Sequence, residues 1–331
     1  VAQSGAVQTS VLDWATSKGI GFSHFVSVGD MSDVDFGDML DYLTADYSAK
    51  AILLYIEAVT HARKFMSAAR AAARVKPVIV VKAGRHLEGA RAAASHTGAL
   101  AGADAVYDAA FRRAGMLRVM DMQALFDAVE TLAMANRFSG DRLAILTNGG
   151  GVGVLATDVL IDKKGRLAEL SSETMARLNS VLPRTWSHNN PVDIIGDAPP
   201  GRYVDALKAL LEDKGVDAIV VLNCPTAVAS STEAARAVVD TLKESGSKAD
   251  SRGLFTSWLG VDSAREARQL FAENRIPTYE TPAEAVRGFM QIVRYRRSQE
   301  TLMETPPNIP EVFEPETEKA RGIVGKALSE G

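Results

Sequence analysis

This sequence has a single cysteine, and that scarcity excludes several classes of protein. Cys224 alone forms no disulfide framework within the chain and builds no cysteine-rich zinc site, so we expect no metal centre of that kind. No run of about 18 uninterrupted apolar residues occurs, so no helix is expected to span a membrane. These absences predict an intracellular protein of a reducing compartment, and we expect the cytoplasm.

An excess of one charge is also missing. The 37 Lys and Arg against 41 Asp and Glu leave a net charge of −4, which predicts no nucleic-acid or acidic-membrane partner. Hydrophobic residues make up 47% and charged residues 24%, as in soluble globular proteins, and this excludes disorder as the main state. The 331 residues suffice for two domains, at roughly 150 residues per domain.

Strand and helix signals alternate along the chain. Short β-branched runs, such as Ala51–Ile56 and Val78–Val81, are bounded by glycine, proline or charge. Between such runs apolar residues recur three and four positions apart, as at Phe36, Met39 and Leu43. This alternation predicts an α/β protein whose parallel strands are joined by right-handed helical crossovers.

The pattern runs twice, which predicts two open, doubly wound sheets in tandem. A glycine turn opens a helix at Ser4-Gly5-Ala6, and another does so at Asn148-Gly149-Gly150-Gly151. We expect a first domain over residues 1–138 and a second over 139–297. Residues 298–331 are rich in proline and acid at first, and we expect an exposed linker followed by the first helix of a further domain.

The two glycine turns are candidate anion sites. A strand, a tight glycine turn and a helix N-terminus present free backbone N–H groups, and the helix dipole adds about half a positive charge. Either turn taken singly is also explained as a tight strand-to-helix connection without a ligand. A dinucleotide oxidoreductase is disfavoured, because the glycines of the second turn lack the full fingerprint spacing and its acidic ribose contact.

His96 and Glu57 are the candidate catalytic residues. Small residues surround His96 in Arg91–Gly102, so a bulky group would reach its imidazole, which is a competent nucleophile at neutral pH. Glu57 follows the buried run Ala51–Ile56 at the sheet edge where ligands bind, and its carboxylate would fix the histidine tautomer. The alternatives are a helix cap or hinge at His96 and a surface charge at Glu57.

Four segments resemble the NDP-forming acyl-CoA synthetases, relatives of succinyl-CoA synthetase. They are Gln3–Ala6, Tyr55–Glu57, Ser95–Gly102 and Thr147–Gly151, and the His-Thr-Gly-Ala sequence after Ser95 is the most specific. The resemblance runs from Val1 to about Arg297 and implies two flavodoxin-like domains of the succinyl-CoA synthetase type. It implies a ligase that makes acyl-CoA from an acid, CoA and a nucleoside triphosphate.

The resemblance also assigns roles to the candidate residues. His96 matches the histidine that is phosphorylated during turnover, and Glu57 matches the glutamate that contacts the phosphohistidine. The two helix N-termini that cradle phosphate match Ser4–Ala6 and Asn148–Gly151, and we expect the two turns to face each other across the domain interface.

The same resemblance implies partners outside this sequence. CoA would bind a domain that precedes Val1, and Mg²⁺ with ATP/ADP or GTP/GDP would bind an ATP-grasp domain after the linker, in cis or as another subunit. A homo-oligomer is expected. Phe111–Val119 and Asn190–Asp193 also resemble multidomain bacterial members, some with an attached acetyltransferase. The alternative function is therefore a CoA- or anion-sensing regulatory module of a protein acetyltransferase.

Overall fold

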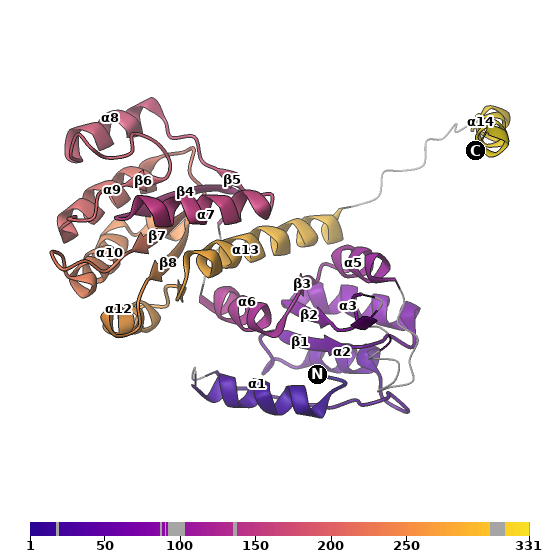
Figure 1. The fold of residues 1–331 in the computed structure, drawn as a ribbon. Coiled ribbons are helices and arrows are strands. Elements are labelled where there is room, and N and C mark those ends of the chain that lie inside the picture. Colours follow the sequence, from indigo (N-terminus) through magenta and orange to yellow (C-terminus); the bar gives the residue numbers. More distant parts are fainter. Residues whose placement is uncertain are drawn as a thin grey trace.

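The chain folds into two lobes, each built on a parallel sheet, as the computed structural model in Figure 1 shows. The structure describes residues 1–17, 20–86, 88, 89, 91, 103–134, 138–304 and 315–330. The first sheet consists of β1 (Ile52–Ile56), β2 (Val78–Lys82) and β3 (Leu117–Val119). The second consists of β4 (Arg142–Thr147), β5 (Arg166–Leu167), β6 (Val192–Asp193), β7 (Ala218–Asn223), β8 (Gly253–Trp258) and β9 (Thr278–Tyr279).

Helices cover both faces of each sheet. Those of the first lobe are α1 (Gly5–Ser17), α2 (Phe36–Ala45), α3 (Ala62–Val75), α5 (Asp104–Arg113) and α6 (Met122–Met134). Those of the second are α7 (Gly150–Asp162), α8 (Ser172–Val181), α9 (Pro200–Glu212), α10 (Ser231–Ser245), α11 (Ser247–Asp250), α12 (Asp262–Glu273) and α13 (Pro282–Met303). Side-chain caps fix several helix starts, among them reciprocal capping boxes at Asp35 and Thr281.

The strand order confirms the doubly wound α/β prediction. The second sheet has the order β5-β4-β7-β8-β9, with β6 also paired to β4, and the first has the order β1-β2-β3. Ala2 extends the first sheet through parallel bridges to Ser27 and Tyr55, and the β-branched segment around Ser27 contributes this one bridge rather than a strand. Because all these pairings are parallel, the carboxyl ends of the strands meet at one edge of each sheet.

Buried apolar residues form a cluster on each face of each sheet. In the second lobe, one face packs against α9, α10 and α12 and the other against α7 and α13. In the first lobe, α2, α3 and α5 cover one face, and α6 covers the other. The continuous burial of β2, β7 and β8 explains why these strands are apolar runs without alternation.

Helices α6 and α13 join the two lobes. The Gln291 side chain of α13 donates to the Ala124 carbonyl at 2.9 Å, and Arg287 pairs with Asp127 at 3.3 Å. The hydroxyls of Thr131 and Tyr279 are hydrogen-bonded at 2.5 Å. These contacts place helix-covered faces, rather than strand ends, between the lobes.

Helix α13 extends past Arg297, although the sequence predicted an exposed linker from residue 298 onward. Helix α13 continues to Met303, because Leu302 is 1% exposed and packs in the core of the first lobe. A further helix, α14 (Thr317–Glu330), follows, and its residues are exposed as far as Ser329. Among the described residues, no helix has the length and apolar character needed to cross a bilayer.

Candidate functional site

Glu57 and Lys82 lie at the carboxyl edge of the first sheet. Glu57 directly follows β1, and Lys82 ends β2, where it pairs in register with Ile56. Both residues are buried, with 8% of Glu57 and 2% of Lys82 exposed. The Oε2 atom of Glu57 is buried and has no hydrogen-bond partner among the residues that the structure describes. A carboxylate oxygen in that state is ready to accept a hydrogen bond from an incoming donor.

Gln3 connects Glu57 to the first glycine turn. Its side-chain Oε1 accepts hydrogen bonds from the backbone N–H groups of Glu57 at 2.7 Å and Ala58 at 2.9 Å. The next residue, Ser4, accepts from the Val7 N–H at 3.5 Å and caps α1. The backbone N–H groups of Gly5 and Ala6, in the first turn of α1, have no partner within the helix. The turn therefore offers anion-binding donors near a buried carboxylate.

The second glycine turn is held by side chains around it. Asn148 donates to the Cys224 carbonyl at 2.9 Å and accepts from the Cys224 N–H at 2.7 Å, so both the N–H₂ and the carbonyl of its amide position the turn. A Cβ atom at Gly149 would lie 2.7 Å from the Cys224 sulfur, and one at Gly150 would lie 2.8 Å from Asp193 Oδ2. Close packing, rather than a positive φ, thus requires glycine at these two positions.

The two turns do not face each other, contrary to the prediction from the repeat. Figure 1 shows α1 and α7 in different lobes, with α6 and α13 between them. The reason is the lobe contact itself, which is made by the helices that follow the last strand of each sheet. In the described part of the chain, the lobes therefore meet through these helices and not through the carboxyl edges that carry Ser4–Ala6 and Asn148–Gly151.

Two family descriptions match this chain in tandem. The "Succinyl-CoA ligase like flavodoxin domain" matches residues 1–132, and the "Ligase-CoA domain" matches residues 143–303. The alpha subunit of acetate–CoA ligase [ADP-forming] I from Pyrococcus furiosus is 38% identical over 90% of this chain and 63% of its own length. Acetate–CoA ligase [ADP-forming] I from Archaeoglobus fulgidus is 38% identical over 100% of this chain and 46% of its own length.

A solved structure agrees with both sequence relatives. The dinucleotide-forming acetyl-coenzyme A synthetase 1 of Ca. Korarchaeum cryptofilum, in complex with phosphate and ADP, superposes with a TM-score of 0.83 at 35% identity. The match covers 91% of this chain and 65% of that chain. The chain belongs to the NDP-forming acyl-CoA synthetase family. It spans about half to two thirds of the length of the relatives named here. Their names give the acetyltransferase alternative no support.

The candidate histidine of this synthetase-family chain, His96, lies outside the described residues. The described chain resumes at Ala103, and α5 begins at Asp104, close to the Lys82 side chain, whose ammonium lies 4.7 Å from the ring centre of Tyr107. Within the described ranges, no group of three or more His, Cys, Asp or Glu side chains is arranged to hold a metal ion.

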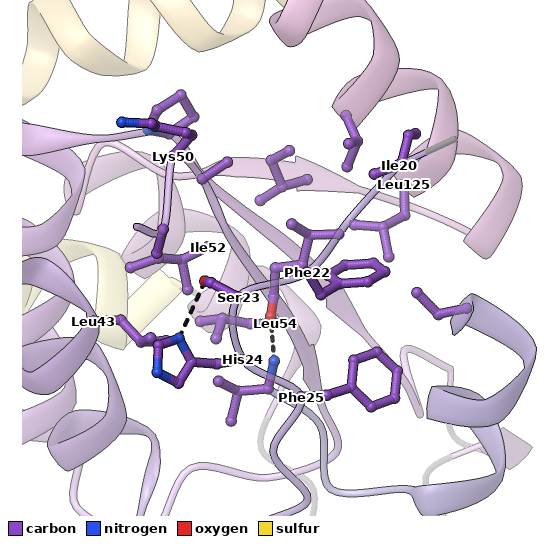
Figure 2. Close-up of a pocket in the computed structure, with 18 of the residues that line it drawn as sticks. Ile20, Phe22, Ser23, His24, Phe25, Leu43, Lys50, Ile52, Leu54 and Leu125 are labelled. Carbon is purple, nitrogen blue, oxygen red and sulfur yellow. Dashed lines mark hydrogen bonds between the residues drawn. The ribbon is translucent and has the colours of Figure 1, made fainter. Parts of the chain in front are cut away.

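The first lobe also contains a cavity of about 550 Å³ that is separate from Glu57. Figure 2 shows its apolar lining, which includes Phe22, Ile52, Leu54 and Leu125. It lies against β1 from the amino end of that strand, and neither Glu57 nor Ser4–Ala6 lines it. Ligands of open α/β sheets bind at the opposite, carboxyl edge, so we do not assign the phosphate to this cavity.

The sequence patterns did not indicate three residues that lie at the carboxyl edges of the two sheets: Gln3, Lys82 and Asp193. Gln3 stands immediately before a glycine turn, and Lys82 ends an otherwise apolar strand, which is an unusual place for a lysine. That position was the one available signal for Lys82. Asp193 approaches Gly150 only because β6 pairs beside β4.

Proposed function

We propose that this chain is the phosphoryl-transfer core of an NDP-forming acyl-CoA synthetase. The overall reaction converts an acid, CoA and a nucleoside triphosphate into acyl-CoA, nucleoside diphosphate and phosphate. The observation that carries the proposal is the buried Oε2 of Glu57, which has no hydrogen-bond partner in the described part of the chain. It lies beside the first glycine turn, in a chain with both family domains. A buried carboxylate oxygen needs a donor, and an imidazole N–H supplies one.

In this proposal His96 is the nucleophile that carries the phosphoryl group. Starting from acyl-CoA, a phosphate oxygen attacks the thioester carbonyl, the C–S bond breaks, and CoA leaves with a proton. One imidazole nitrogen of His96 then attacks the phosphorus of the acyl phosphate, and the carboxylate leaves. Glu57 accepts the N–H of the other ring nitrogen and stabilises the positive charge on the phosphorylated ring. The nucleoside diphosphate finally takes the phosphoryl group and frees the histidine.

The first glycine turn would hold phosphate during these steps. The N–H groups of Gly5 and Ala6, the hydroxyl of Ser4 and the positive end of the α1 dipole would stabilise phosphate oxygens. The second turn, Asn148–Gly151, is proposed as a further phosphate-binding element. Because α6 and α13 separate the turns of one chain, we propose that it reaches the same phosphate from a second copy, in a homo-oligomer.

The nucleotide and CoA sites are proposed to lie on further domains or subunits. The sequence relatives are longer than this chain, and one of them is by name a subunit alpha. Mg²⁺ would accompany the nucleotide, where it supplies charge neutralisation of the diphosphate. The relatives are named for acetate, 4-hydroxybutyrate and feruloyl substrates, so we propose a carboxylic acid without restricting its size.

The experiment that tests this function follows the phosphoryl group. The assembled enzyme is this chain together with the domains or subunits that supply its CoA and nucleotide sites. With phosphate-labelled nucleoside triphosphate and Mg²⁺ it should form an acid-labile, base-stable phosphoenzyme. Glu57→Gln should slow labelling by about 10²–10⁴-fold, because the carboxylate orients and stabilises the imidazole without reacting itself. Labelling of Glu57→Gln at the wild-type rate would contradict the role of Glu57.

A further inference from the structure

The ammonium groups of two buried lysines in the first lobe have different sets of partners. Lys76 donates to the carbonyls of Leu43 at 2.7 Å and Asp46 at 2.8 Å, which close the end of α2. Lys82 is 2% exposed, and among the described residues its ammonium donates to the carbonyl of its neighbour Ala83 alone and lies 4.7 Å from the Tyr107 ring centre. Over the part of the chain that the structure describes, no carboxylate comes within ion-pair distance of Lys82. Its charge is therefore not compensated by direct contact.

The Glu57 carboxylate likewise lacks a partner for one of its oxygen atoms in the described structure. Its residue is 8% exposed, and its Oε2 is buried without a partner among the described residues. The two side chains begin on neighbouring strand ends, because Ile56 and Lys82 are partners in the parallel register. A buried carboxylate and a buried ammonium at one sheet edge each cost free energy alone, and the charge of one offsets part of that cost for the other.

The other charges at this edge already have partners. Arg118 on β3 pairs with Asp104 and with Asp108 at 3.1 Å, both from α5. Tyr55 on β1 has its pKa raised by burial and by Glu57. Burial lowers the pKa of Lys82, Asp104 opposes that shift, Arg118 adds to it, and Glu57 opposes it. Of these groups, Glu57 is the anion that no other cation pairs with in the described structure.

We propose that Lys82 is a positioning residue of the phosphoryl-transfer site, whose ammonium compensates the Glu57 carboxylate across the ends of β1 and β2. The Glu57 carboxylate is then available to accept the imidazole N–H. The catalytic part of this inference rests on the proposed function, whereas the charge pairing is a property of this chain alone. Lys82 acts through Glu57, so its effect depends on the negative charge at residue 57.

A double-mutant cycle at residues 57 and 82 of this chain, measured by melting temperature, tests the pairing. Lys82→Met leaves a buried carboxylate without a counter-charge and should lower the melting temperature by roughly 5 °C or more. Glu57→Gln with Lys82→Met removes both charges and should recover much of that loss. If Lys82→Met does not fold but the double variant does, the pairing is supported. A double variant no more stable than Lys82→Met, or losses that simply add, would overturn it.

Lys76→Met is the matched control for this cycle. It removes a lysine that is buried in the same lobe but donates to carbonyls at the end of α2. It should lower the melting temperature by itself, and adding Glu57→Gln should change that loss only additively. Suppose that Glu57→Gln recovers as much stability when added to Lys76→Met as when added to Lys82→Met. That result would show that the recovery is non-specific and would overturn the pairing.

A rate cycle on the assembled enzyme tests the catalytic role. Lys82→Met should slow phosphoenzyme formation by about 10²-fold, and Lys82→Arg should retain most of the rate. Once Glu57→Gln is present, Lys82→Met should cost less than about threefold more, because the charge it compensates is gone. If the rate losses of Lys82→Met and Glu57→Gln multiply in the double variant, the positioning role is overturned. Absence of label in the wild type would count against the proposed function instead and would leave the stability cycle to decide the pairing.

Discussion

The Oε1 atom of Gln3 accepts the backbone N–H groups of both Glu57 and Ala58, which lie 54 and 55 positions further along the chain. One side chain thus links the residue before the first glycine turn to the backbone of the candidate catalytic carboxylate. The turn and Glu57 are held in a fixed relationship although they belong to different crossover units. Several measurable consequences come from this arrangement and from the packing around it.

Gln3→Ala should weaken both stability and the site. It leaves two backbone N–H groups without their acceptor, at a cost of about 1–3 kcal/mol, or about 1–4 °C in melting temperature for a chain of this size. Gln3→Glu keeps an acceptor at the same place and should lose less. Thermal unfolding of the three proteins checks this, and equal losses for the two variants would contradict the hydrogen-bond role.

Gly149→Ala and Gly151→Ala should differ although both lie in the second glycine turn. The added Cβ meets the Cys224 sulfur at 2.7 Å at the first position and nothing within 4 Å at the second. Gly149→Ala should therefore destabilise by about 1–3 kcal/mol, while Gly151→Ala should be neutral or stabilise by up to about 1 kcal/mol. Urea unfolding measures both, and the same sign of change at both positions would be inconsistent with this packing.

Asp217 should contribute stability that depends on pH. Burial opposes its ionisation, but hydrogen bonds from the Arg142 side chain and backbone outweigh burial and leave its pKa below the ordinary value of 3.8. A carboxyl with a lowered folded-state pKa binds fewer protons when folded, so its stabilisation is present above about pH 4 and is lost as pH falls further.

The Asp217→Asn variant tests this sign. At pH 7 it should lose about 2 kcal/mol or more of unfolding free energy, because the Arg142 bonds become weaker. The gap between wild type and variant should shrink when urea unfolding is repeated near pH 3. Asp240→Asn, at an exposed position of α10, should show neither effect. A gap that widens at low pH would contradict the assignment.

The sequence was sufficient for the long buried strands and for the places along the chain of the two glycine turns. Strand β2 and strand β7 are buried on both faces, so each appears as a continuous apolar run that needs no tertiary information. Glu57 was located by the same logic, since a charged residue that ends such a run lies at the carboxyl edge of the sheet.

The relative placement of the two turns was not predictable in this way. The internal repeat suggested that equivalent turns face each other, but the contact between the lobes is made by α6 and α13. Both helices have apolar faces toward their own sheets, and nothing in the sequence periodicity indicates that they also pack against each other. The Gln3–Glu57 and Asn148–Cys224 bonds were likewise hidden, because each joins residues that only the tertiary fold brings together.

The most direct test of the proposed function is the site of phosphorylation in the assembled enzyme. With labelled nucleoside triphosphate and Mg²⁺, or with acyl-CoA and labelled phosphate, wild type should carry an acid-labile, base-stable label that peptide mapping places on His96. His96→Ala should abolish the label, and His86→Ala, at an exposed position before the same segment, should retain it. Wild-type labelling of His96→Ala, or an acid-stable label on another residue, would contradict the account.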